Sequence, residues 1–135
     1  MKFKTLTGSR KSLVKAKKYL IDWDGKSRSK LQYSIKSFLK EFWVNQVVFE
    51  EFPIVGTRMT LDFYNANKKI AIEVQGAQHT QYVPFFHGRR SNFTHQLRRD
   101  EKKLQFCQLN AIKLIEIYSK DKVSKEIFES QGVYL

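Results

Sequence analysis

The sequence predicts an α/β (α+β) fold in which a mixed β-sheet of about four strands is flanked by helices. Four short segments, apolar or alternating, have the length and composition of strands: 46–54, 59–64, 69–75 and 111–118. Segments with apolar residues three or four apart precede these strands, separate the third from the fourth, and follow the last. Strands interleaved with helical segments are typical of a sheet covered by helices, and this sets the fold class.

The chain has the length and composition of one compact domain. Its 135 residues, 41% hydrophobic and 14% aromatic, supply enough material for a single core and exclude global disorder. We therefore expect one domain, 1–135, in three parts. These are a basic helical N-terminal part (1–45), a core that carries the candidate chemistry (46–118) and a C-terminal helix (119–135).

Two helices are expected in the N-terminal part. A short one spans 9–23, and a second, capped by Ser27 or Ser29, runs to about Val44. The apolar face of the second helix is formed by Leu31, Ile35, Phe38, Leu39 and Phe42. Its lysines are expected to lie off that face: Lys30, Lys36 and Lys40.

The first three strands are expected to form a meander, because Pro53 ends one strand and short turns at 55–58 and 65–68 separate the others. The segment 76–92 has no clear period and is typical of a covering loop. The remaining elements follow in chain order: a helix from Asn92 to about Asn110, the strand 111–118 and a helix over 123–131.

The charge of the chain favours a polyanionic partner. The net charge is +12 with a pI near 9.9, and residues 1–45 hold twelve Lys or Arg against three acids. Nucleic acid is the partner that such a surface predicts, and a solvated charged face is the alternative.

The cysteine count and the hydropathy indicate a cytoplasmic protein. The single cysteine, Cys107, rules out an internal disulfide and a cysteine-based zinc site. No apolar run reaches 18 residues and the N-terminus lacks the apolar core of a secretory signal, so we expect no membrane partner. A basic helix lying on a membrane is a weaker alternative.

Two acidic residues in neighbouring strands are the first candidates for chemistry. If the turn at 65–68 joins the strands, Tyr64 lies opposite Lys69 and Asp62 opposite Ala71, with Glu73 as the diagonal neighbour of Asp62. Asp62, Glu73 and Gln75 then share one face, and the reverse face is apolar: Leu61, Phe63, Ile70, Ile72 and Val74. The alternative is that the polar face is exposed to solvent.

Asp100 and His79 extend this candidate site. Asp100 interrupts an apolar helical stripe, where a carboxylate needs a partner, and Lys103 one turn on is the structural alternative: the stripe is Phe93, Leu97, Leu104, Cys107 and Ala111. His79 follows the strand that carries Glu73 and has the position of a proton donor or acceptor. His87 and His95 have no comparable neighbours, which favours a structural or surface role.

The chemistry that suits these residues is phosphodiester hydrolysis with a hard divalent cation. Asp62 and Glu73 would hold Mg²⁺, with Mn²⁺ a possible substitute, and His79 would serve the attacking water or the leaving oxygen. Nearby Arg and Lys side chains would offset the charge of the transition state.

The pattern D-x10-E-x-Q from Asp62 to Gln75 resembles the PD-(D/E)XK nuclease superfamily, with Gln75 at the usual lysine position. The residues LDFYNANKKIAIEVQGAQH and RRDEKKLQFCQLNAIKLIEIY, within 46–118, more specifically resemble the phage EDxHD homing endonucleases, relatives of very-short-patch repair endonucleases. The resemblance implies a restriction-endonuclease-like sheet and site residues at Glu50 (or Glu51), Asp62, Gln75, His79 and Asp100.

The resemblance also implies an endonuclease that acts on double-stranded DNA at a defined locus, in the cytoplasm of the host cell if the gene belongs to a phage. A repair or junction-resolving nuclease of the same fold, and a non-catalytic DNA-binding module, are the alternatives. A homodimer is possible. The residues expected to contact DNA phosphates are Lys17, Lys18, Arg89, Arg90 and Lys103.

Overall fold

The structure, a computed structural model, describes residues 1–75 and 90–135. Its main sheet has the order β3-β4-β5-β6, with bounds Val48–Pro53, Thr60–Asn65, Ile70–Gln75 and Lys113–Tyr118. The first three strands pair antiparallel, and β6 pairs parallel with β5. The predicted mixed four-stranded sheet is therefore confirmed, including the meander.

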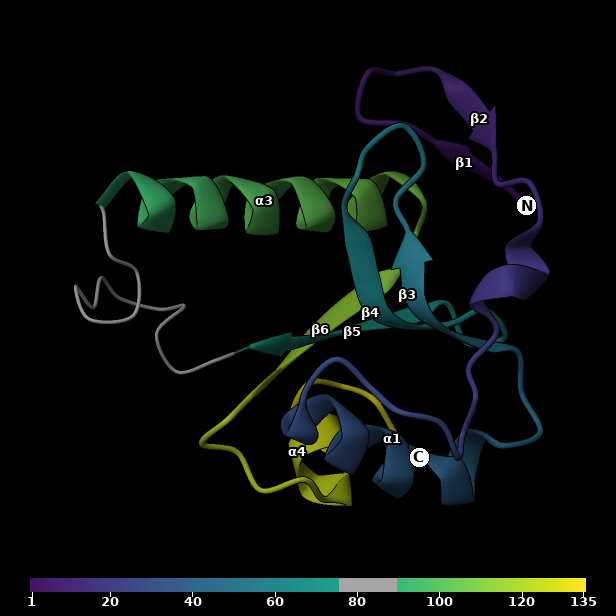
Figure 1. Ribbon diagram of the computed structural model, residues 1–135, viewed down its shortest axis with the longest axis vertical. Coiled ribbons are helices and arrows are strands. Elements are labelled where there is room, and N and C mark those ends of the chain that lie inside the picture. Colours follow the sequence, from purple (N-terminus) through teal and green to yellow (C-terminus); the bar gives the residue numbers. More distant parts are fainter. Residues whose placement is uncertain (76–89) are drawn as a thin grey trace.

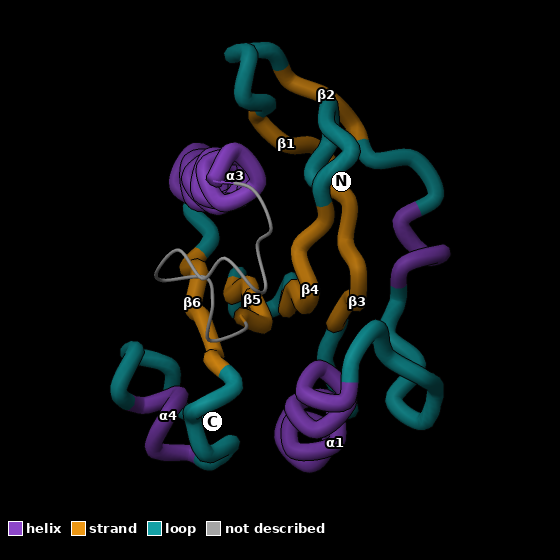
Figure 2. The backbone as a smooth tube through the Cα atoms, turned by 60° about the vertical axis from the view of Figure 1, so that its left-hand side comes forward, coloured by secondary structure: helices purple, strands orange, loops and turns teal. Residues whose placement is uncertain are grey.

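Helices cover both faces of this sheet. The helix α3 (Arg90–Leu109) lies across one face, and α1 (Lys30–Trp43) and α4 (Lys125–Glu129) lie on the other (Figure 1). The view in Figure 2, nearly along α3, shows the same three layers with the sheet between the helices. The predicted helix from Asn92 begins two residues earlier than expected, at Arg90.

The predicted helix over 9–23 is wrong. The chain starts instead with a hairpin of β1 (Lys2–Lys4) and β2 (Arg10–Ser12), followed by a four-residue 3₁₀ helix, η1 (Ala16–Tyr19). Phe3 is buried between two exposed lysines, which is the alternation of a strand, and it packs edge-on against Phe52 with ring centroids 5.7 Å apart. Lys15 has a φ of 57°, a left-handed conformation that interrupts any helix through this segment. The N-terminal part is thus only partly helical.

The second predicted helix is confirmed as α1, and Ser29 is its N-cap. The Ser29 hydroxyl accepts a hydrogen bond of 3.1 Å from the backbone N–H of Gln32, which satisfies one of the unpaired donors of the first turn. Ile35 and Leu39 are fully buried, as the apolar spacing predicts. Lys36, however, is also fully buried rather than on a polar face, because it has a buried partner on β3.

The register between β4 and β5 differs from the prediction by two residues. Tyr64 pairs with Ala71 and Phe63 with Ile72, so continuing the pairing sets Asp62 across from Glu73. The reason is a turn that lies one residue later in the chain than expected, with Lys69 in a left-handed conformation at φ 55°. A shift of two residues preserves the alternation, so Asp62, Glu73 and Gln75 stay on one side of the sheet. Leu61, predicted on the reverse face, lies instead in the core cluster with Tyr64 and Phe106.

The core divides into two clusters, one on each side of the sheet. Beneath α3 lie Phe3, Phe52, Leu61, Tyr64, Ala71, Phe106 and Cys107. Between the sheet and the helices α1 and α4 lie Ile35, Leu39, Trp43, Phe63, Ile72, Ile115 and Phe128. Tyr64 and Ala71 share the β4–β5 face with the acidic pair, so that face is polar only toward the end of β5.

The apolar stripe predicted along α3 is only partly correct. Phe106 and Cys107 are fully buried, whereas Leu97 and Leu104 remain 43% and 45% exposed. The N-terminal half of α3, which carries Leu97, extends past β3 and β4 (Figure 1), so there is less sheet beneath it to bury that side chain. Burial raises the pKa of the Cys107 thiol to about 12, which keeps it protonated and unreactive.

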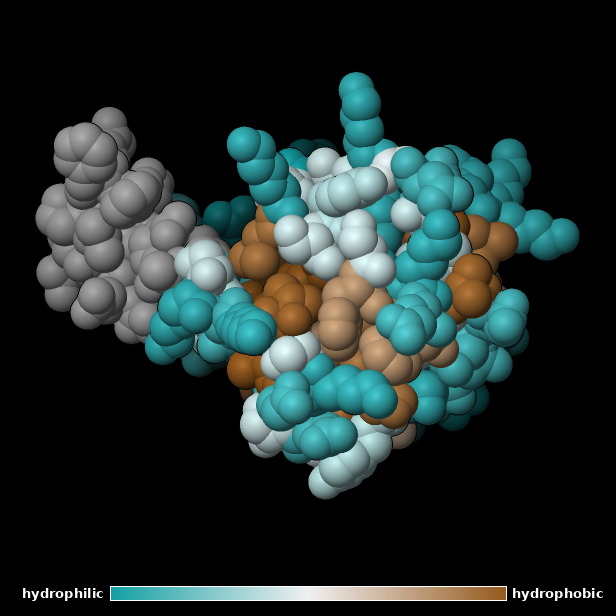
Figure 3. Space-filling model, turned by 90° about the horizontal axis from the view of Figure 1, so that it is seen from below, coloured by the Kyte–Doolittle hydropathy of each residue, from teal (hydrophilic) through white to brown (hydrophobic). Residues whose placement is uncertain are grey.

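The face formed by α1 and α4 carries apolar side chains at its surface (Figure 3). Figure 3 looks onto this face, where brown apolar side chains gather among teal hydrophilic ones. Partly buried apolar residues of these two helices include Leu31, Phe38, Phe42 and Ile127. A homodimer would need such a surface, and it stays a prediction. Within residues 1–75 and 90–135, no helix is both long and apolar enough to cross a membrane.

Candidate functional site

Asp62 and Glu73 form a buried acidic pair where β4 and β5 stop pairing through their backbones. The backbone N–H of Asp62 donates to Glu73 Oε2 over 2.8 Å, and the N–H of Val74 donates to Asp62 Oδ2 over 2.8 Å. Each carboxylate therefore takes the place of a backbone acceptor on the facing strand. Their side of the sheet is not solvent-exposed as the alternative held, because Asp62 is 7% and Glu73 4% exposed.

Both carboxyl groups of this pair are held in an environment that disfavours two negative charges. Burial, and then the charge of Asp62, raise the pKa of Glu73 to about 7, while Lys103 lowers it. The pKa of Asp62 is also raised by burial, and Glu51 adds to the rise, whereas the Val74 N–H and Lys103 lower it. A buried acidic pair of this kind is stabilised by any cation that reaches it.

Lys103 supplies one such cation from α3. Its ammonium lies 2.5 Å from Glu73 Oε1, and its side chain is only 18% exposed. It was predicted either as a DNA contact or as the structural partner of Asp100. Its ion pair with Glu73 adds it to the acidic site, and both earlier expectations stay predictions.

The structure distinguishes between Glu50 and Glu51, which the sequence left open. The Glu50 carboxylate is tied to the helix side of the sheet, where it accepts hydrogen bonds from Ser27, Gln32 and Lys36 at 2.7–3.1 Å. Glu51 instead accepts from Thr60 Oγ1 at 2.9 Å on the adjacent strand, and its charge acts on Asp62. Of the two, Glu51 is the carboxylate beside Asp62, and the catalytic role predicted for Glu50 or Glu51 stays a prediction.

Gln75 and Asp100, both predicted site residues, line one cavity of about 760 Å³ between α3 and the strands β5 and β6. Other lining residues are Leu97, Glu101, Leu104, Glu116 and Tyr118. Gln75 is 4% exposed and lies on β5 two residues after Glu73, so this cavity adjoins the acidic pair. Its lining is acidic, which suits a cation.

Several predicted residues lie elsewhere or outside the described part of the chain. His79, His87 and Arg89 are outside the described residues, and Arg90 is placed only as the first residue of α3. Lys17 and Lys18 are exposed on η1, and Lys18 lines a cavity together with Arg28, Glu50 and Glu51. Their predicted contact with DNA phosphates stays a prediction.

Two cationic residues near the site were missed in the sequence. Arg28 forms an ion pair with Glu51 over 2.9 Å, and Lys36 forms one with Glu50 over 3.1 Å. Each partner lies 14 or more residues away in the chain, so no local pattern indicates the pairing. The only signal was indirect, since two adjacent acids in a strand imply cations on both sides of it.

The acidic pair offers carboxylate oxygens, the type of donor that Mg²⁺ prefers. Among the described residues, no group of three or more His, Cys, Asp or Glu side chains is placed to hold a metal ion. Mg²⁺ commonly takes one or two carboxylates and completes its shell with waters and substrate phosphates. Asp62 and Glu73 supply those two carboxylates.

Replacing Glu73 by glutamine is expected to change how stability depends on pH. With EDTA present, the folded pKa of about 7 lies above the unfolded value of 4.5, so the stability that Glu73 contributes to the wild type is greatest below pH 4.5. It falls as the pH rises to about 7, by up to about 3 kcal/mol, and then levels off. The Glu73→Gln variant lacks this fall, which thermal unfolding from pH 4.5 to 8.5 measures.

The exposed acid Glu129 on α4 provides the matched control. Glu129→Gln should follow the wild-type pH dependence. A Glu73→Gln variant that loses stability in parallel with the wild type across this range would contradict the raised pKa.

Comparisons with known proteins identify viral relatives without assigning a family. No family model and no solved structure match the chain. The uncharacterized protein 094L of Frog virus 3 (isolate Goorha) is 46% identical over 66 residues, which cover 48% of this chain and 43% of that protein. The uncharacterized protein 307L of Invertebrate iridescent virus 6 is 37% identical over 59 residues, 44% of this chain and 30% of that protein.

A third relative, the uncharacterized protein 033L of Invertebrate iridescent virus 3, is 34% identical over 65 residues, 48% of this chain and 34% of that protein. The matched segments thus span less than half the length of each of these relatives. The comparisons establish that about half of this chain is shared with proteins of viruses that infect frogs and invertebrates, as their names state.

Proposed function

We propose that this protein is a divalent-metal-dependent endonuclease that hydrolyses phosphodiester bonds in double-stranded DNA. The observation that carries the proposal is the buried pair of Asp62 and Glu73 with Lys103 on one of its oxygens. Burying two carboxylates side by side is unfavourable, and a domain of this size gains no stability from it. Such a pair is typical of a site whose purpose is to hold a cation.

The charge of the chain supports DNA as the substrate. The net charge of +12 gives the surface a strong attraction for a polyanion, while the acidic pair is sequestered under α3. A polyanion attracted to the surface and a cation held by two carboxylates together favour phosphodiester chemistry over a role in binding alone. The resemblance to PD-(D/E)XK nucleases, and to the EDxHD group within them, leads to the same proposal.

Each residue of the site then has a distinct role. Mg²⁺, or Mn²⁺ in its place, would polarise the scissile phosphate and lower the pKa of a bound water. Asp62 and Glu73 provide the oxygens that hold the cation, and the N–H of Val74 fixes the orientation of the Asp62 carboxylate. Lys103 favours the ionised form of Glu73, because it lowers the raised pKa of that group. The role of His79 as proton donor or acceptor, the homing role and the phage origin stay predictions.

Incubation of the purified chain with supercoiled plasmid and linear duplex DNA, with Mg²⁺ or with EDTA, tests the proposal directly. We expect nicked or linear products with Mg²⁺ and none with EDTA, because the acidic pair needs the cation. Mismatched and branched DNA in the same panel separate a repair or junction-resolving nuclease from a homing one. DNA binding without cleavage on every substrate, with Mg²⁺ or Mn²⁺, would replace the proposal by the non-catalytic binding module.

A further inference from the structure

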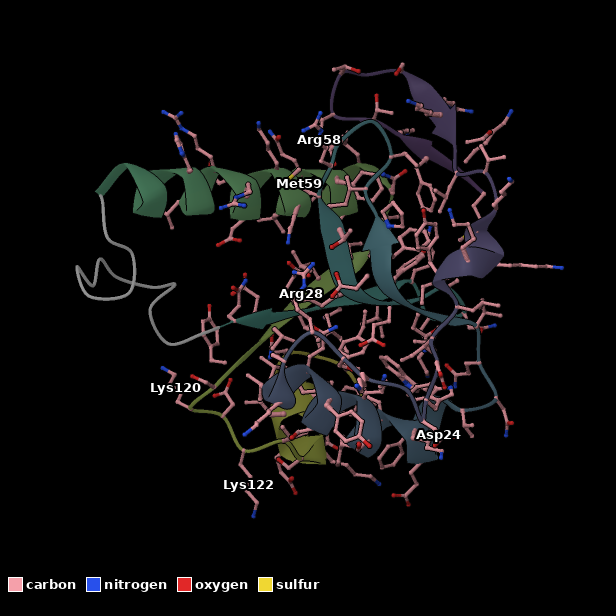
Figure 4. All side chains as sticks on the ribbon, in the orientation of Figure 1. Asp24, Arg28, Arg58, Met59, Lys120 and Lys122 are labelled. Atoms are coloured by element: carbon pink, nitrogen blue, oxygen red, sulfur yellow. The ribbon has the colours of Figure 1, made fainter. Side chains whose placement is uncertain are left out.

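Arg28 lies at the acidic site although it belongs to the loop before α1. Its Nη2 is 2.9 Å from Glu51 Oε2, and its positive charge also acts on Asp62. Figure 4 shows Arg28 pointing from this loop toward α3, the helix that carries Lys103. The carboxylates therefore have one cation from each side, Lys103 on Glu73 and Arg28 on Glu51.

Glu51 is held in place by donors from three separate elements. It accepts hydrogen bonds from Gln32 Nε2 at 3.2 Å on α1 and from Thr60 Oγ1 at 2.9 Å on β4, and it forms the ion pair with Arg28 of the loop before α1. Three donors leave a carboxylate little rotational freedom. The position of the Arg28 guanidinium is thereby fixed relative to the strand that carries Asp62.

This arrangement does not serve stability. Glu51 has a φ of 53°, and a left-handed conformation at a non-glycine residue costs about 1–2 kcal/mol. Its charge also raises the pKa of Asp62, although less than burial does, which adds an unfavourable like-charge interaction. The ion pair with Arg28 is largely exposed, and such pairs contribute only about 0–1 kcal/mol. A strained backbone whose contacts contribute so little stability is characteristic of functional sites.

Arg28 also keeps the donors that a substrate would need. A guanidinium has five N–H donors, and the Arg28 side chain is 67% exposed while it contacts Glu51. Lys103 in contrast is mostly buried and is occupied by Glu73. Of these two cations, Arg28 is the one whose charge reaches solvent beside the acidic pair.

We propose that Arg28 is a catalytic residue that binds a non-bridging oxygen of the scissile phosphate, and that Glu51 is the positioning residue that aims it. The inference rests on the proposed endonuclease function and adds to it the group that offsets the charge of the transition state. A planar guanidinium suits this task because it donates two parallel hydrogen bonds to phosphate oxygens. The interaction strengthens as charge builds on those oxygens during the displacement.

The test measures single-turnover cleavage rates and DNA affinity separately, for the wild type, Arg28→Ala, Arg28→Lys and the control Arg58→Ala. Arg58 is exposed at the tip of the β3–β4 hairpin, where it offers the same loss of charge. We expect Arg28→Ala to lower the cleavage rate about 100-fold and DNA affinity less than about fivefold. Arg28→Lys should recover part of the rate, since it retains the charge without the fork geometry.

The outcomes separate this inference from the proposed function. Arg58→Ala should change affinity alone, and thermal unfolding should show all variants folded, since both side chains are exposed. A wild type that cleaves, together with an Arg28→Ala variant of equal rate, overturns the role of Arg28 and leaves the endonuclease intact. An equal loss of rate and affinity in Arg28→Ala reduces the residue to a binding contact and also overturns the inference. A wild type that cleaves nothing overturns both proposals.

Discussion

Replacing Asp62 by asparagine is expected to lower Mg²⁺-dependent DNA cleavage by at least about 1000-fold while DNA affinity changes less than about threefold. The substitution keeps an oxygen that accepts from the Val74 N–H, so the local backbone pairing is retained. It removes one of the two negative charges that hold the cation. Asp62 is 7% exposed, so it adds little to the surface that meets DNA.

Single-turnover cleavage and a binding titration in Ca²⁺ or EDTA measure the two effects. Asp24→Asn is the matched control, because that side chain is 83% exposed and paired with Lys40 at the surface. It should cleave at the wild-type rate. Asp62→Ala should be as inactive as Asp62→Asn, with an added loss of stability from the unpaired Val74 N–H. An active Asp62→Asn variant would remove the basis for the proposed site.

The part of the site that depends only on the alternation of side chains along a strand could be predicted from the sequence. Alternation along β4 and β5 sets Asp62, Glu73 and Gln75 on one side, and this survived an error of two residues in the register. The register itself depended on a turn in which a lysine adopts a left-handed conformation. Composition favours Gly, Asn or Asp there, so the sequence holds no signal for that choice at Lys69.

The alternation of side chains along a strand could not decide between Glu50 and Glu51. A regular strand sends adjacent residues to opposite faces, but the left-handed backbone at Glu51 departs from regular geometry. The outcome is decided by partners distant in the chain, which are Lys36 for Glu50 and Arg28 for Glu51. Long-range ion pairs of this kind leave no periodic trace in a single sequence.

In the N-terminal segment, by contrast, the spacing of apolar residues led to a wrong prediction. Apolar residues near helical spacing predicted a helix over 9–23, whereas the chain turns at Gly8 and runs back as β2. The hairpin places Phe3 of β1 in the core, where its ring contacts Phe52 and Phe106. Tertiary packing overrode weak local propensity there.

Replacing Lys36 by methionine is expected to destabilise the protein by about 3–5 kcal/mol, the cost of leaving one member of a buried ion pair alone. Lys36 is fully buried, with its ammonium 3.1 Å from Glu50 Oε1 and 3.3 Å from the carbonyl of Lys26. Methionine fills similar volume but leaves the Glu50 carboxylate, 12% exposed, without its counter-charge. Thermal unfolding should show a fall in Tm of about 10 °C or more.

Two further variants separate this structural role from catalysis. Lys40→Met on the same helix removes a surface pair with Asp24, so it should cost less than about 1 kcal/mol. Lys36→Met combined with Glu50→Leu removes both charges and should recover most of the lost stability. Because Glu51, and not Glu50, lies beside Asp62, this double variant should also cleave DNA at a rate near that of the wild type. Restored stability with lost cleavage would instead return Glu50 to the catalytic site, as the sequence first predicted.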